Sequence, residues 1–80
     1  MKSGIEDIVG KHISGIMVKS RPVGQSPRMQ VFLLFDDESY YELYSHDCEI
    51  QGISAVRHGD IETVRRLMGD TAEIVLEKSL

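Results

Sequence analysis

Features that define several large classes of protein are missing from this chain. Its 80 residues include a single cysteine, Cys48, so no internal disulfide bond can form. No apolar run is long enough for a transmembrane helix. The first residues carry acids early and have no apolar segment, which argues against a secretion signal. These absences predict one domain, residues 1–80, located in the cytoplasm and without a membrane contact.

Catalytic and ligand-binding motifs are also scarce. The glycines in the first half of the chain are scattered, without the spacing of a phosphate-binding loop. His46, Cys48 and His58 match no zinc-binding pattern, and a structural zinc site takes four ligands. The acids at residues 36–38 lack the spacing of a calcium loop, which favours a solvated turn. We therefore assign no catalytic, cofactor-binding or metal-binding residue, expect no cofactor, and favour a non-catalytic protein.

Negative charge is in excess, but it is unevenly distributed. The net charge is −4, which weakly disfavours general binding to nucleic acid. Residues 1–35 carry five basic and two acidic side chains, whereas residues 36–80 carry four basic and eleven acidic ones. Lys19, Arg21 and Arg28 lie around a loop that contains both prolines of the chain. This loop is therefore the candidate for contacting an anionic ligand.

The richest stretch of aromatic and branched side chains, residues 29–45, predicts a β-hairpin. Residues 31–35 and 39–44 have strand-forming sequences, and the acidic residues between them favour a turn. The turn has no glycine, which argues against a two-residue type I′ turn and favours a four-residue loop with Phe35 opposite Tyr40. A three-residue loop is the alternative, and it would shift every partner by one residue.

Both faces of this predicted hairpin are apolar. With a four-residue loop, one face carries Phe32, Leu34, Tyr41 and Leu43. The other face carries Met29, Val31, Leu33, Phe35, Tyr40 and Tyr44, with Glu42 among them. A sheet with one face in water alternates apolar and polar residues, and this hairpin does not in either register. We therefore expect a cover on each face.

The other segments predict strands and helices around the hairpin. Residues 11–20 form a first strand, in which Gly15 marks a bulge or a close backbone approach. Asp60 caps a helix at residues 61–68, whose apolar side chains form one stripe. Three further elements complete the chain: a helical turn at residues 5–9, a short weak strand at residues 49–53 and a closing edge strand at residues 72–77.

Together these segments predict an α+β fold. The sheet is antiparallel, with about four to five strands in the order β-β-β-(β)-α-β and one helix packed on one face. The alternative is a small, partly closed β-barrel with one helix, which would place both apolar faces inside.

The uncovered hairpin face predicts a non-catalytic interaction module that forms a homodimer. Most oligomers are symmetric homodimers, and a large open apolar patch is unusual on a monomer. The candidate interface residues are Val31, Leu33, Phe35, Tyr40 and Tyr44. The alternative is a ligand- or nucleic-acid-binding accessory domain that uses Lys19, Arg21 and Arg28 with the surface tyrosines. Glu42 lies between the two tyrosines and repels phosphate, so nucleic acid is the less favoured partner.

Overall fold

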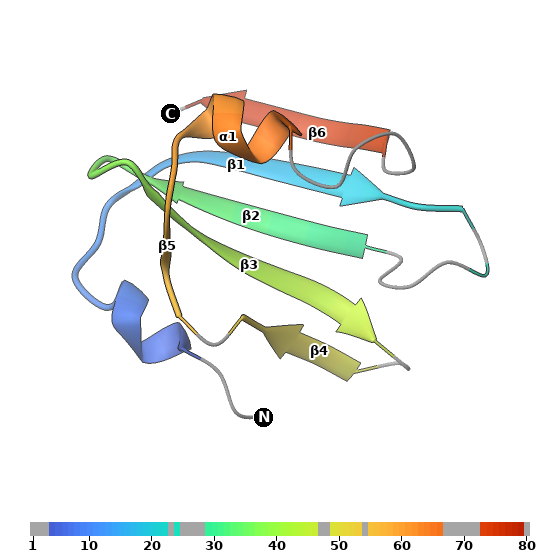
Figure 1. The fold of residues 1–80 in the computed structure, drawn as a ribbon, viewed down its shortest axis with the longest axis horizontal. Helices are drawn as coiled ribbons and strands as arrows, with labels where there is room; N and C mark the ends of the chain where they lie inside the picture. The colour runs from blue at the N-terminus through green and yellow to red at the C-terminus, as the bar shows by residue number, and fades with distance from the viewer. Residues whose placement is uncertain are drawn as a thin grey trace.

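In the part of the chain that the structure describes, the protein folds as one open antiparallel sheet with a single α-helix (Figure 1). The computed structural model describes residues 4–22, 24, 29–46, 49–53, 55–66 and 73–79. The elements are η1 (Ile5–Ile8, a 3-10 helix), β1 (Ile13–Ser20), β2 (Met29–Phe35), β3 (Ser39–His46), β4 (Glu49–Gly52), β5 (Arg57–His58), α1 (Ile61–Arg66) and β6 (Glu73–Ser79). The predicted α+β fold is confirmed, and the sheet is not closed into a barrel.

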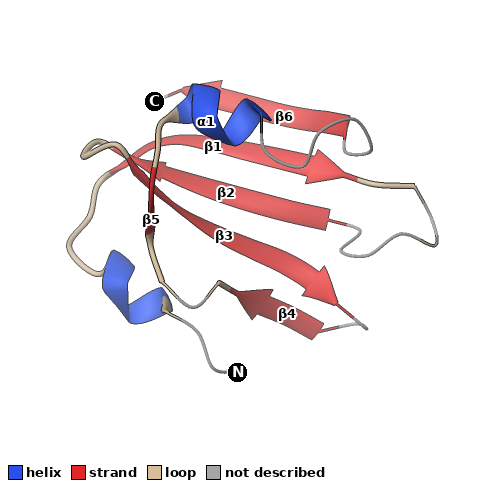
Figure 2. Cartoon of the chain, viewed as in Figure 1, coloured by secondary structure: helices blue, strands red, loops and turns tan. Residues whose placement is uncertain are grey.

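The strand order is β4-β3-β2-β1-β6, with β5 paired to the start of β3 beside β4 (Figure 2). The meander of β1, β2 and β3 arises because the predicted hairpin and first strand are neighbours in sequence. The edge position of β6 is confirmed. Strand β5, with only two residues, has no counterpart among the predicted elements.

The favoured four-residue hairpin loop is wrong, and the alternative, a three-residue loop, is confirmed. Leu34, not Phe35, pairs with Tyr40, so three residues connect β2 to β3. Glu38 adopts a φ of 62°, the left-handed conformation that ends a three-residue loop built on a type I turn. The carbonyl oxygen of Glu38 accepts a hydrogen bond from the Gly59 backbone N–H at 2.8 Å. The segment that precedes α1 therefore forms a hydrogen bond with this turn, although it is not part of the hairpin.

The register shift changes which residues share a face. Tyr40 and Tyr44 now lie with Phe32 and Leu34, on the side that we call the helix face. The helix face also carries Met17, Lys19, Gln30 and Glu42. The opposite side, which we call the rear face, carries Ile16, Val18, Met29, Val31, Leu33, Phe35, Tyr41, Leu43, Ile50, Leu76 and Lys78.

Gly15 marks a bulge in β1, as predicted. The pairing with β2 shifts between Ile13 and Gly15. A Cβ atom at Gly15 would lie 3.1 Å from the carbonyl oxygen of Lys78 and 3.8 Å from Leu34 Cβ. Glycine at this position therefore allows β6 to approach β1 closely.

The hydrophobic core lies between the helix face and α1. It comprises Met17, Phe32, Leu34, Tyr40 and Val64, with Ile61 packed against it. The rings of Phe32 and Tyr40 lie 6.3 Å apart at an interplanar angle of 57°. Asp60 caps α1, because its Oδ1 accepts a hydrogen bond from the Thr63 backbone N–H at 3.0 Å. The predicted cap is confirmed, and the predicted end of the helix at residue 68 lies outside the described residues.

Lys19 holds the other end of α1. Its ammonium group is buried and donates hydrogen bonds to the carbonyl oxygens of Val64 at 2.7 Å and Arg65 at 3.3 Å. These carbonyls belong to the last described turn of the helix, where carbonyl oxygens commonly take partners from outside the helix. Burial lowers the pKa of Lys19, and the charge of Glu42 opposes this shift. The structure thus places this predicted ligand-binding residue in a structural role.

Candidate interaction surface

The two faces of the sheet differ in how well their central strands are covered. On the helix face, Met17, Phe32 and Leu34 are buried under α1. On the rear face, four apolar side chains in the middle of the same two strands are only half-buried; they are Ile16, Val18, Val31 and Leu33. Side chains in the middle of a sheet become buried only when another layer packs on them. The described residues therefore provide a layer over part of the rear face and none over the rest.

The covered part of the rear face lies near the β2–β3 turn. The segment at residues 4–12 contacts this end: Lys11 forms an ion pair with Asp37, and the Lys11 Nζ atom lies 5.6 Å from the centroid of the Phe35 ring. The Asp36 backbone N–H donates to the carbonyl oxygen of His12 at 3.1 Å. Phe35, predicted as an interface residue, is buried here. This part of the face already has its cover.

Tyr41 is the most deeply buried side chain of the covered part. It is 0% exposed, and its hydroxyl group has no hydrogen-bond partner among the described residues. A buried hydroxyl without a partner costs free energy, because it has lost its hydrogen bonds to water.

Replacing Tyr41 with phenylalanine is therefore expected to raise the free energy of unfolding by about 1 kcal/mol, measured by urea denaturation. The matched control is Tyr44→Phe, which removes a hydroxyl that donates to Gln51 Oε1 at 3.4 Å and should not stabilise the protein. A loss of stability in Tyr41→Phe would show that the Tyr41 hydroxyl is hydrogen-bonded.

The open part of the rear face lies at the far end of the hairpin. Met29 is 41% exposed and Ile50 is 71% exposed. Between them is a depression of about 250 Å³, which we call the apolar pit; it is lined by Met29, Val31, Leu43, Tyr44, Ser45 and Ile50. None of these residues is charged. Among the rear-face side chains that the structure describes, the charged one is Lys78, on the edge strand β6.

The predicted interface residues do not form one surface. Val31, Leu33 and Phe35 lie on the rear face, whereas Tyr40 and Tyr44 lie on the helix face. Tyr40 is 4% exposed and belongs to the core, so it cannot stack on a base or a sugar.

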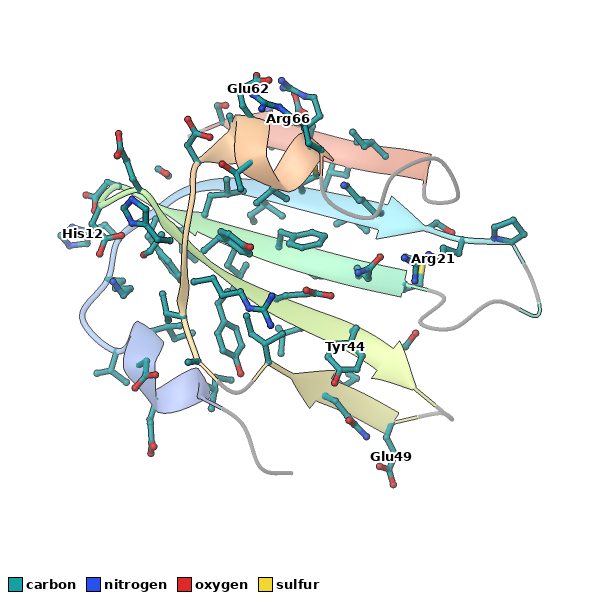
Figure 3. The ribbon with its side chains drawn as sticks, viewed as in Figure 1. His12, Arg21, Tyr44, Glu49, Glu62 and Arg66 are labelled. Atoms are coloured by element: carbon teal, nitrogen blue, oxygen red, sulfur yellow. The ribbon has the colours of Figure 1, made fainter. Side chains whose placement is uncertain are left out.

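The predicted basic group is also divided. Arg21 is buried and lies at the same end of the sheet as the half-buried Tyr44 (Figure 3). Arg28 lies outside the described residues. The ammonium group of Lys19 is hydrogen-bonded to carbonyl oxygens at the end of α1.

The helix face beyond α1 is polar. Gln30 is buried, and its Nε2 donates to Glu42 Oε2 at 2.8 Å. The charge of Glu42 also raises the pKa of Lys19 against the effect of burial. The amide oxygen of Gln30 is buried and has no hydrogen-bond partner among the described residues.

Sequence reasoning missed Leu43 and Ile50 as members of the open surface. Leu43 was assigned to the wrong face by the hairpin register, and Ile50 lies on a strand too short for a clear alternating pattern. The available signal was the spacing of Ile50 and Gly52. They are two residues apart on one strand and therefore share the rear face.

Two classes of site find no support in the described part of the chain. No group of three or more His, Cys, Asp or Glu side chains there could hold a metal ion. Nor does any described helix have the length and apolar character needed to cross a membrane. No protein-family model, curated protein or solved structure matches this chain.

Proposed function

We propose that this protein is a non-catalytic interaction module that forms a homodimer through the open part of its rear face. The observation that carries the proposal is the contrast between adjacent residues of β2. Phe32 is buried on the helix face, whereas Val31 and Leu33 are only half-buried on the rear face of the same central strand. A second layer over Val31 would complete the sandwich that the rest of the fold begins.

A second copy of the chain is the partner that fits this surface best. The apolar pit has no charged lining residue, so two copies can meet there without bringing like charges together. A strongly charged partner would find no opposite charge in the pit, and burying its charge would cost free energy. Two sheets that pack face to face lie about 10 Å apart, with interdigitating side chains. The rear face offers such side chains on β1, β2, β3 and β4.

The size of the surface predicts a weak dimer. A typical stable interface buries roughly 800 Å² on each partner. Strands lie about 4.8 Å apart and rise about 3.3 Å per residue, so the whole rear face measures roughly 500 Å² before side-chain relief is counted. Residues 4–12 already cover its end near the β2–β3 turn. The dissociation constant is therefore expected in the micromolar range or weaker.

Sedimentation velocity of the wild-type protein tests this proposal. Over concentrations from about 10 µM to about 1 mM, the weight-average sedimentation coefficient should rise from the monomer value towards the dimer value, which corresponds to a dissociation constant within that range. A constant monomer value throughout would contradict the proposal. A continued increase beyond the dimer value would contradict the symmetric, closed assembly.

The proposal includes a cytoplasmic setting. The one cysteine of the chain cannot form an internal disulfide bond, so the fold depends on packing and not on an oxidising compartment.

A further inference from the structure

The geometry points to a reciprocal contact in which Ile50 of each copy enters the apolar pit of the other. This inference rests on the proposed homodimer and specifies how its two copies fit together. It gives Ile50 the role of an anchor residue, and it makes the pit the recognition site for an aliphatic side chain.

Ile50 has the properties of a protruding anchor. It lies on β4 opposite Ser45 and is 71% exposed, which leaves most of an aliphatic residue in water. β4 is an edge strand of four residues, so no neighbouring strand shields Ile50 on its outer side. A large exposed aliphatic side chain beside an apolar depression is the arrangement found at interface anchors.

The pit is large enough to accept this side chain. An apolar cavity of about 150 Å³ holds a benzene molecule. The depression of about 250 Å³ beside Ile50 therefore has room for the side chain of an isoleucine. Its floor and walls include Val31 and Leu43 from the two central strands of the hairpin.

Adjacency of anchor and pit produces a closed dimer. Ile50 itself lines one side of the pit, so the two features lie next to each other on one surface. A two-fold axis that passes between them places each Ile50 over the partner's pit, and both contacts form at once. Both sites are then occupied, and no third copy can add through the same contact.

Two complementary variants test this contact. Ile50→Lys places a cation at the anchor and changes one side of the pit, while the other five lining residues stay as they are. Ser45→Asp places a carboxylate in the pit lining and leaves the anchor intact; it also keeps an acceptor for the Met29 backbone N–H, which now donates to Ser45 Oγ at 3.2 Å. Each variant alone is expected to dimerise at least about tenfold more weakly than wild type, because a charge enters an apolar contact.

Mixing the two variants is expected to restore association. In a mixed dimer, the introduced ammonium group meets the introduced carboxylate, while the remaining Ile50 enters a pit in which Val31, Leu43 and Ser45 are unchanged. Sedimentation velocity of the equimolar mixture should therefore show a dimer at concentrations where each variant is monomeric. Val9→Lys, at an apolar residue that is 82% exposed and lies outside the pit, is the control that should behave as wild type.

The possible outcomes separate this inference from the proposed function. If wild type is monomeric at all concentrations, the homodimer itself is wrong. If wild type dimerises and the mixture stays monomeric, or if Ile50→Lys dimerises as well as wild type, the reciprocal contact is wrong and the homodimer uses another part of the rear face. Should either charged variant unfold, Ile50→Ala replaces it: unchanged dimerisation would overturn the anchor role, and weaker dimerisation would support it.

Discussion

Replacing Phe32 with alanine is expected to lower the free energy of unfolding by about 3–5 kcal/mol, because the change leaves a cavity in a close-packed core. Phe32 is 0% exposed, packs against Tyr40 and lies at the centre of the core under α1. A domain of 80 residues has a total stability of about 4–12 kcal/mol, so this single change removes much of it. Urea denaturation followed by circular dichroism measures the loss.

The matched control for Phe32→Ala is Phe32→Leu, which keeps most of the apolar volume and should lose much less stability. Both measurements belong at low protein concentration, since dimerisation would add to the apparent stability of the folded state. A loss below about 1 kcal/mol in Phe32→Ala would show that the ring is not part of a close-packed core.

Replacing the preceding residue, Val31, with lysine is expected to have the opposite effect: dimerisation weakens, while the stability of the monomer changes little. Val31 lies on the rear face and lines the apolar pit, so a lysine there would place a charge at the centre of the proposed dimer contact. We expect at least about a hundredfold weaker dimerisation, because a charge buried without a partner is costly at an interface. In the monomer, the long side chain can extend its ammonium group into water, so stability should change little.

Sedimentation velocity measures the first effect of Val31→Lys, and urea denaturation at low concentration measures the second. Val9→Lys adds the same charge outside the pit and should leave both quantities near the wild-type values. Dimerisation of Val31→Lys at wild-type strength would place the contact elsewhere. A large loss of monomer stability would show instead that Val31 is covered within the single chain.

The sequence predicted the hairpin and the edge position of β6 from neighbouring residues, whereas it did not predict the full strand order of the sheet. The meander of β1, β2 and β3 follows from alternating strand-forming segments joined by turn residues. Gly15 revealed the bulge, and Asp60 revealed the start of α1, because each residue type has a specific local effect on the backbone.

The choice between the two candidate hairpin registers was beyond this kind of reasoning. It depends on the left-handed conformation of Glu38, which a sequence usually signals with glycine or asparagine. A shift of one residue moves every side chain of a strand to the other face, so this small error placed Tyr40 and Tyr44 with Val31 and Leu33, from which the observed register separates them.

The cover over Phe35 was unpredictable for a different reason. It depends on Lys11, a residue far away in sequence that reaches Asp37 in the turn. The role of Lys19 has the same origin, since its ammonium group binds carbonyl oxygens of α1 that are 45 residues further along the chain. Neither contact leaves a periodic pattern in the sequence. The prediction that one face of the sheet is incompletely covered did not depend on these two contacts. In the structure, this prediction applies to the rear face.

The pairing of β1 with β6 has a consequence for the order in which the protein folds. Gly15 lies opposite Ser79, so the strand that pairs with the β1 edge of the three-stranded meander comes from far along the chain. Local hairpins close quickly, whereas contacts between distant segments form late because the intervening chain must first be ordered. During synthesis, β1, β2 and β3 can therefore pair while the free edge of β1 and the helix-face side of Phe32 still await α1 and β6. In that interval the nascent protein is most exposed to aggregation and to capture by chaperones.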